Sequence, residues 1–398
     1  MAGFFPVLFK EYWSHGADVA ESTYKLGMAN SLASVIVAVM APVIGAIADR
    51  GGVKKKFLFY FALMGVVMTG SLYFVEMGNW ALAVFIYVMA TVGFSSGNVF
   101  YDSLIFEVAD KRSMNFVSAL GYSLGYLGGG VLFSINVWMV LRPETFGLSG
   151  MEEAKRLAFV MVAVWWAVFS IPILLFVPES KTGRETAGWR CIPQGFAQLK
   201  STFSEARKMR VVFLFLIAYW LYIDGVDTIV RMAVNFGMDL GFDSSKLILA
   251  LLVTQFVGFP AAIVMGKMGD WVGTKKAIYF CIGVYIAVTI YAMFLDSVKG
   301  FYVLAVSIGL VQGGVQSLSR SFYTTIIPKS KSAEFFGLYN MLGKFAAVLG
   351  PLMIGWVSLL TGNPRLSILS LVLLFASGAV VLWFVNEEEG RRMAEELE

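Results

Sequence analysis

The stretch Gly45-Ala-Ile-Ala-Asp49-Arg50-Gly-Gly52-Val-Lys54-Lys55 occurs a second time in this chain, as Gly266-Lys-Met-Gly-Asp270-Trp-Val-Gly273-Thr-Lys275-Lys276. Both copies read G-x-x-x-D-x-x-G-x-K-K, and their aspartates lie 221 residues apart (270 − 49). Each copy follows an apolar run that is long enough to cross a membrane. We call the two copies the signature loops. A repeat of this kind predicts two related helical halves, with the loop at the same place in each.

The composition of the 398 residues shows that water is not the main solvent of this protein. Hydrophobic residues make up 58% and charged residues 15% of the chain, and the mean hydropathy is +0.74. Soluble globular chains are about 45–50% apolar and about 25% charged. These values exclude a soluble enzyme, a nucleic-acid-binding protein and a secreted disulfide scaffold. With two cysteines and one histidine, we also expect no metal site and no cofactor.

Eleven apolar runs are long enough to span a membrane. They lie at about 26–48, 57–77, 80–104, 115–140, 157–177, 211–232, 247–268, 277–295, 300–322, 335–360 and 366–385. Met1–Phe9 is a shorter apolar stretch of about 13 Å as a helix, less than half of a hydrocarbon core of about 30 Å. We expect it to be the outer half of a first helix whose beginning is missing. The expected fold is an all-α membrane protein of two parallel six-helix halves, with eleven full spans and a half-helix.

Basic residues predict the orientation of the connecting loops. The longest segment between spans, residues 178–210, is rich in Lys and Arg, and the positive-inside rule predicts that it is cytoplasmic. The loops that then share its side carry more than twice as many Lys and Arg residues as those opposite. We expect an N-terminal helix bundle at 1–177, a cytoplasmic linker at 178–210, a C-terminal bundle at 211–386 and a cytoplasmic tail at 387–398, in the cell (inner) membrane.

The signature loops resemble the cytoplasmic signature of the major facilitator superfamily. Four further stretches resemble one branch of it, the "unknown major facilitator" family, which is related to the autophagy-associated vacuolar amino-acid effluxers of fungi. They are Asn98-Val-Phe-Tyr-Asp102-Ser-Leu, the glycine-rich 121–130, Tyr219-Trp-Leu-Tyr-Ile-Asp-Gly and residues 335–351 up to Gly350-Pro351. The resemblance implies a transporter that exports an amino acid or a similar small solute.

The resemblance also implies a role for the signature loops. In the superfamily the aspartate of the first copy lies near the start of the eleventh helix, which corresponds here to about Glu334 and Phe335. A carboxylate there would stabilise the closed cytoplasmic face by about 0.3–1 kcal/mol through the helix dipole, and we expect Asp49 and Asp270 to be gate residues. In the alternative interpretation the glycines only form turns and the lysines only anchor the loops on the anionic leaflet.

Asp224, Asp227, Arg231 and Lys344 fall inside predicted spans, and an ionisable side chain at mid-membrane costs about 2.5–3.5 kcal/mol. Asp224, Asp227 and Arg231 are spaced to share one helical face. We predict a substrate or proton site at Asp224 and an outer gate pair of Asp227 and Arg231, the alternative being a self-satisfied structural triad. Lys344 lies near mid-membrane and needs a carboxylate, most simply Asp224, a cluster of carbonyl groups or an anionic substrate group.

A further group of charges ends two spans on the cytoplasmic side. Asp102 and Glu107 end the fourth span, and Arg320 ends the tenth, which occupies the equivalent place in the second half. We predict that Asp102 and Arg320 bridge the halves when the cytoplasmic side closes. In the alternative interpretation these are unrelated capping and interface charges.

Taken together, the sequence predicts a monomeric secondary transporter that moves a small-molecule substrate across the lipid bilayer by alternating access. No Walker motif is present, so ATP is not the direct energy source. A proton gradient is the expected driver, and facilitated diffusion is the alternative. A lipid flippase or sensor with the same fold is a rival prediction. An intramembrane enzyme is disfavoured because the single histidine, His15, lies in an outer loop and leaves serine chemistry without a base.

Overall fold

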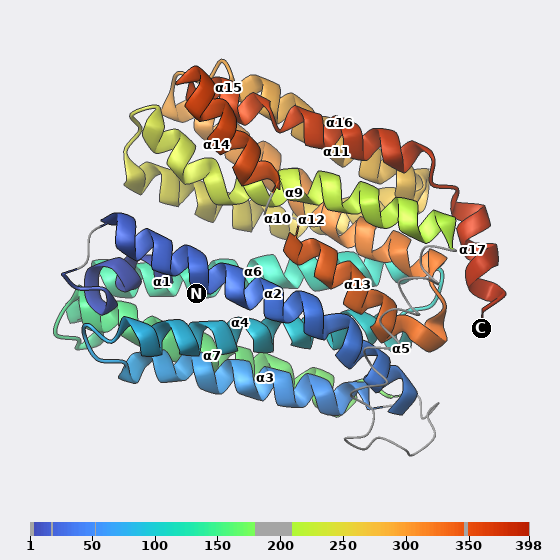
Figure 1. The fold of residues 1–398 in the computed structure, drawn as a ribbon, viewed down its shortest axis with the longest axis horizontal. Helices are drawn as coiled ribbons and strands as arrows, with labels where there is room; N and C mark the ends of the chain where they lie inside the picture. The colour runs from blue at the N-terminus through green and yellow to red at the C-terminus, as the bar shows by residue number, and fades with distance from the viewer. Residues whose placement is uncertain (1–3, 17–18, 52, 180–208, 346–348, 398) are drawn as a thin grey trace. The chain divides into compact units, whose positions relative to one another are not determined.

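The computed structural model describes residues 4–16, 19–51, 53–179, 209–345 and 349–397, and in these ranges all regular structure is helical. The long helices in the first half of the chain are α2 (Val19–Gly51), α3 (Lys54–Ser71), α4 (Trp80–Ser103), α6 (Met114–Leu141) and α7 (Met151–Phe176). Those in the second half are α9 (Arg210–Asp239), α10 (Ser244–Val272), α11 (Thr274–Ala292), α12 (Val298–Ile326), α13 (Ser332–Phe345), α14 (Leu349–Thr361) and α16 (Val372–Trp383), with the short α15 (Pro364–Leu369) before α16 (Figure 1).

Shorter elements connect these helices. They are α1 (Phe5–Leu8), the π-helix η1 (Phe9–Trp13), α5 (Ile105–Val108), α17 (Glu387–Glu395) and the 3-10 turns η2 (Leu72–Phe74), η3 (Pro143–Phe146) and η4 (Lys329–Lys331). The apolar segment at the start of the chain is therefore helical from Phe5 to Trp13.

The predicted spans coincide with these helices. Ten helical segments of the described residues are long and apolar enough to cross a membrane, and α14 is a shorter apolar helix. The predicted span 335–360 corresponds to α13 and α14, on either side of residues 346–348, which lie outside the described residues. Helix α7 begins six residues before its predicted start, because its first turn holds Glu152 and Glu153. Acidic residues stabilise a helix N-terminus, but they lower the hydropathy that located the span.

The described residues form two compact units. Unit 1 comprises the described residues of 1–107, 132–196 and 336–341, and unit 2 comprises those of 108–131, 197–335 and 342–398. Each unit thus includes a short segment from the opposite half of the sequence. The first part of α6 belongs to unit 2, and six residues of α13 belong to unit 1. The predicted linker lies mostly at 180–208, outside the described residues, and the predicted domain boundaries stay predictions.

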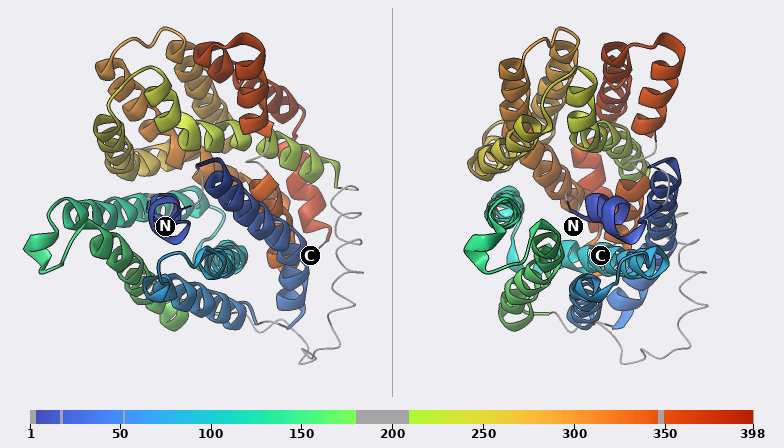
Figure 2. Two further views of the ribbon diagram at one scale, coloured as in Figure 1. Left: turned by 60° about the vertical axis from the view of Figure 1, so that its left-hand side comes forward. Right: turned by 90° about the vertical axis from the view of Figure 1, so that its left-hand side faces the viewer.

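In unit 1, α3 packs against α4 and α7, and Figures 1 and 2 show the three helices side by side. Helices α3 and α4 approach closely at two glycines, since a Cβ atom added to Gly93 would lie 2.7 Å from the backbone nitrogen of Gly65. The N-terminal helical segment is part of the same core. Phe5, Phe9 and Trp13 are buried, and the Trp13 indole donates a 3.2 Å hydrogen bond to the carbonyl of Val75.

In unit 2, α12 packs against α10 and α11, and α9 packs against α16. The α9–α12 contact includes a buried hydrogen bond of 2.6 Å between the hydroxyls of Tyr222 and Ser319. Helices α10 and α12 meet at Gly309, where an added Cβ would lie 2.9 Å from the carbonyl oxygen of Thr254. Small residues let membrane helices pack this closely without a hydrophobic driving force between them.

Candidate functional site

The first part of α6 lies along α10 and α12 within unit 2, although it comes from the other half of the sequence. The Ser118 hydroxyl donates to the carbonyl of Ser317 at 2.7 Å, and the Tyr126 hydroxyl donates to Oε1 of Gln316 at 3.0 Å. We call this contact the α6 seam. Its α6 residues are Asn115, Ser118, Ala119, Tyr122, Ser123 and Tyr126.

Glycines of α10 and α12 make the α6 seam tight. A Cβ added to Gly266 would lie 2.5 Å from the Cβ of Ala119, and one added to Gly313 would lie 2.8 Å from the Tyr126 ring. Gly266 therefore lies inside α10 and permits helix contact, which corrects its interpretation as a turn residue. Gly273, the second repeated glycine, does form the turn, with a φ of 95° before α11.

Asp270 of the second signature loop lies at the end of the α6 seam. Its Oδ1 accepts a 2.9 Å hydrogen bond from the side-chain amide of Asn115, in the first turn of α6, and the same amide nitrogen is 3.1 Å from Oγ1 of Thr274. Asp270 therefore contacts a residue at the start of a helix. The family resemblance implies a contact of the same kind for Asp49, the equivalent residue of the first signature loop. Its role as a gate stays a prediction.

Arg320 is buried in the α6 seam, with 4% of its surface exposed. Its Nε donates to the hydroxyl of Ser118 at 3.0 Å, and one terminal nitrogen donates to the Ser118 carbonyl at 2.9 Å. The guanidinium lies 4.7 Å from the centre of the Tyr122 ring, a cation–π contact worth about 2 kcal/mol when desolvated. Sequence reasoning missed Ser118 and Tyr122, although their spacing of four places them on one helical face. The predicted bridge between Asp102 and Arg320 stays a prediction.

Asp102 lies in unit 1, near the end of α4, with 7% of its surface exposed. Its Oδ2 accepts a 3.1 Å hydrogen bond from the side-chain amide of Asn340, which also donates to the carbonyl of Phe336 at 3.0 Å. Asn340 belongs to the segment of α13 that packs in unit 1, where an added Cβ on Gly337 would lie 2.6 Å from Cα of Pro42 in α2. Glu107, the other predicted charge at this end, is half-buried in α5.

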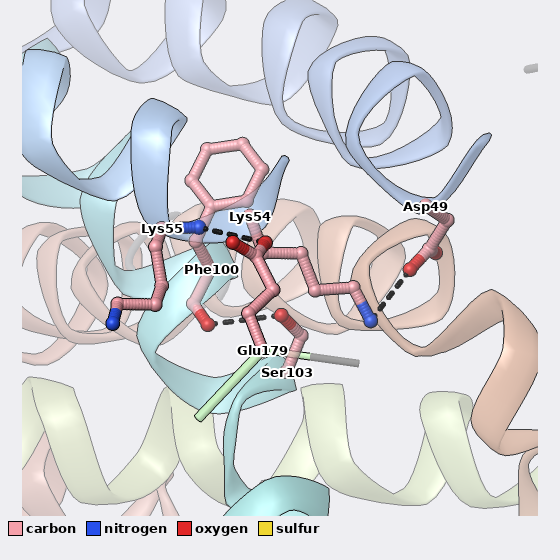
Figure 3. A network of polar contacts seen from close by, with 6 residues as sticks. All are labelled: Asp49, Lys54, Lys55, Phe100, Ser103 and Glu179. Atoms are coloured by element: carbon pink, nitrogen blue, oxygen red, sulfur yellow. Dashed lines mark hydrogen bonds and ion pairs between the residues drawn. The ribbon is translucent and has the colours of Figure 1, made fainter. Parts of the chain in front are cut away.

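The first signature loop forms a polar network within unit 1, which Figure 3 shows from close by. Asp49 pairs with Lys54 at 2.8 Å. The backbone N–H of Lys55 donates to Oε1 of Glu179 at 3.1 Å, while its ammonium donates to the carbonyl of Val177 at 2.7 Å. Lys55 thus joins the start of α3 to the end of α7. The side chain of Arg50 and all of Gly52 lie outside the described residues, and the predicted contact of Asp49 near Glu334 and Phe335 stays a prediction.

The second signature loop repeats this arrangement in unit 2. Lys275, the second residue of α11 as Lys55 is of α3, donates to the carbonyls of Val385 at 2.7 Å and Trp383 at 3.2 Å, at the end of α16. A lysine near a helix C-terminus satisfies carbonyls that have no partner within the helix. These two lysines therefore join helix ends, while Lys276 is exposed and suits the expected anchor on the membrane surface.

The charged residues of α9 lie in three different environments. Asp224 is fully buried, and its carboxylate accepts hydrogen bonds from the backbone N–H groups of Leu349 and Gly350, each at 2.9 Å. Asp227 is half-buried and Arg231 is exposed. The partner of Asp224 that the sequence suggested, Lys344, lies in α13 with its side chain outside the described residues. The start of α14 is a partner that sequence reasoning missed.

The profile of the family described as "Vacuole effluxer Atg22 like" matches residues 16–114 and 106–395, almost the whole chain. The chain belongs to this family. Among Atg22-like relatives, the uncharacterized MFS-type transporter YxiO of Bacillus subtilis (strain 168) is 38% identical over 387 residues, covering 96% of this chain and 90% of that protein. Autophagy-related protein 22 of Yarrowia lipolytica is 26% identical over 457 residues, covering 92% and 76%.

Solved structures show the fold of this Atg22-like protein. The major facilitator proton:xylose symporter XylE, bound to 6-bromo-6-deoxy-D-glucose, matches with a TM-score of 0.75 at 14% identity, covering 100% of this chain and 94% of that one. The major facilitator transporter FucP in its outward conformation matches with a TM-score of 0.71 at 13% identity, covering 96% of both chains.

The family and the fold together confirm the coarse predictions. The chain is a multi-pass membrane transporter of the major facilitator superfamily, as the signature loops indicated. The prediction that it is not an enzyme is confirmed as well, because its relatives and structural neighbours are transporters.

Proposed function

We propose that this Atg22-like transporter exports a small polar solute, most simply an amino acid, by alternating access. The family description names a vacuole effluxer, and the bacterial relative is an MFS-type transporter. We propose further that the protein acts as a monomer in the cell membrane, with the linker and the C-terminus in the cytoplasm, as the distribution of basic residues predicts.

The observation that carries alternating access is the composition of the α6 seam. A helix from the first half of the sequence meets two helices of the second half through hydrogen bonds, a cation–π contact and glycines. Each hydrogen bond contributes only about 0.5–1.5 kcal/mol net, since water replaces a lost partner. A contact of this kind opens to water at a modest cost, whereas exposing an apolar core would cost about 25 cal/mol for each Å².

Charged residues of both units supply the proposed gates. In the proposal the second signature loop closes on α6 through Asp270, and the first closes through Asp49 near Glu334 and Phe335, at the start of the eleventh helix. Asp102 and Arg320 form the latch predicted from their places in the two halves, with Glu107 beside it. A proton gradient drives transport, with Asp227, Arg231 and Lys344 as the coupling candidates; facilitated diffusion is the alternative.

Counterflow in proteoliposomes tests the function. The purified protein is reconstituted into vesicles loaded with unlabelled amino acids, and entry of a labelled amino acid is followed. We expect entry that depends on the internal amino acid and that an Arg320→Gln variant slows, because its planar amide carries no charge for the cation–π contact. Lys276→Gln, at an exposed position, is the matched control and should transport normally.

The same vesicles test the rival function. A fluorescent phospholipid in the inner leaflet would move outward if the protein were a flippase. Lipid movement without counterflow of any amino acid would refute the proposed function. Movement of the labelled amino acid with no change in lipid distribution would refute the rival.

A further inference from the structure

Leu349 and Gly350 are the first described residues of α14, and they lie inside the stretch 335–360 that the hydropathy assigns to one membrane span. The first N–H groups of a helix have no acceptor within the helix. In the hydrocarbon core no water is present to accept them, so the protein itself must do so. A helix that starts at this depth therefore needs an acceptor from another element.

The carboxylate of Asp224, on α9, supplies that acceptor. Its Oδ2 accepts from the N–H of Leu349 and its Oδ1 from the N–H of Gly350, each at 2.9 Å. The hydroxyl of Thr228, one turn further along α9, donates to the same Oδ1 at 3.2 Å. All three partners are donors, so they match an ionised carboxylate, which only accepts. The carboxylate also faces the positive end of the α14 dipole, where a negative charge is favourable.

Gly350 provides independent evidence that this contact is built for close approach. A Cβ added to Gly350 would overlap Oγ1 of Thr228 and would lie 2.8 Å from Oδ1 of Asp224. Gly355, on the same helix, has no atom within 4 Å of an added Cβ. Of these two glycines of α14, only Gly350 has neighbours that leave no room for a side chain.

We infer that Asp224 is a positioning residue that fixes the start of α14 on α9 and stays ionised through the transport cycle. The charged residues near it on α9 are Asp227 and Arg231, and α14 carries no ionisable side chain. Lys344 stands on α13 with its side chain outside the described residues. The inference replaces the prediction that Asp224 carries a coupling proton, and it leaves that task to another group of the chain.

A mechanical consequence follows from the same contact. Because Asp224 holds the first turn of α14, we infer that helices α9 and α14 move together when the transporter changes conformation. This consequence holds for any transported solute, so it stands apart from the proposed amino-acid export.

Hydrogen–deuterium exchange of the full-length protein in nanodiscs tests the inference without any substrate. The readout is the exchange rate of the backbone amides of residues 349–361, measured at about pH 5 and about pH 9, the range in which buried carboxyl groups are known to titrate. In the wild type we expect the same protection factor at both values. In Asp224→Asn we expect exchange about tenfold to a hundredfold faster at both values, since the amide group offers a single acceptor atom for two N–H groups. Asp227→Asn, one turn along α9, is the matched control and should leave α14 unchanged.

A lower protection factor of α14 in the wild type at the acidic value would overturn the inference, because a cap that takes up a proton would release the helix. Exchange in Asp224→Asn equal to the wild type would overturn it as well. If Asp224→Asn does not fold, the pair Gly350→Ala and Gly355→Ala decides the matter. We expect faster exchange at the start of α14 only in Gly350→Ala, and equal exchange in the two variants would refute the contact.

Discussion

Replacing Asn115 by Asp should open the end of the α6 seam at which Asp270 lies. The side-chain amide of Asn115 donates to Asp270 at 2.9 Å, and a hydrogen bond to a charged group contributes about 1.5–3 kcal/mol. The substitution removes this bond and places two carboxylates in contact, which repel by about 1 kcal/mol even in water at about 4 Å. Asp270 is exposed, so the value of the repulsion in water applies.

The two effects add to about 3 kcal/mol, which corresponds to roughly a hundredfold shift of the closed–open equilibrium at about 1.4 kcal/mol for each tenfold change. Helix α6 itself should persist, since an acidic residue in its first turn is favourable.

The assay is the rate at which a cysteine at position 123 reacts with a water-soluble thiol reagent, in a background with Cys191→Ser and Cys281→Ala. Ser123 is buried, and its hydroxyl donates to the carbonyl of Phe259 at 2.6 Å, so Ser123→Cys reacts only when the seam opens. We expect labelling roughly a hundredfold faster with Asn115→Asp than without it. The control Phe116→Asp adds the same charge at the next, exposed residue. Equal labelling with and without Asn115→Asp would refute the reasoning.

Two further predictions concern the loops at the same end of the helices. Lys275→Met should lower the free energy of unfolding by about 1–3 kcal/mol, because two carbonyls at the end of α16 lose their donor. The control Lys276→Met should change the free energy of unfolding by less than about 0.5 kcal/mol. Denaturant unfolding of the two variants in detergent measures the difference. The hydrogen bond from the Ser113 hydroxyl holds the pKa of the Asp110 carboxyl below its ordinary value of 3.8. The ionised carboxylate therefore stabilises the turn before α6 at pH values above 3.8, and this stabilisation is lost as the pH falls through the lowered pKa. Ser113→Ala should raise the pKa of Asp110, which a carboxyl NMR titration measures, and an unchanged pKa would contradict the assignment.

The spans and the fold class were predictable from the sequence because each rests on a strong signal. Apolar runs of about 20 residues have few interpretations, and the repeat from Gly45 to Lys55 and from Gly266 to Lys276 predicted the major facilitator fold. Residues 349–351, by contrast, lie in a continuous apolar run. Hydropathy therefore gave no sign that a helix begins at Leu349.

The partners of the charged residues were not predictable for a different reason. Lysines next to a membrane suggest contact with lipid headgroups, yet Lys55 and Lys275 bind carbonyls more than 100 residues away in the sequence. Similarly, Arg320 binds Ser118 through a contact between opposite halves of the sequence. Such contacts depend on which helix ends meet, and neither periodicity nor composition encodes that.

The most direct test of the account is whether transport requires the α6 seam to open. Cysteines at positions 115 and 274, whose side chains are in hydrogen-bond contact in the closed seam, are bridged by a short bifunctional thiol reagent that reduction cleaves. Counterflow of a labelled amino acid is then measured before bridging, after bridging and after reduction. We expect bridging to stop counterflow and reduction to restore it. Counterflow that continues at full rate with the bridge in place would show that transport does not require the α6 seam to open.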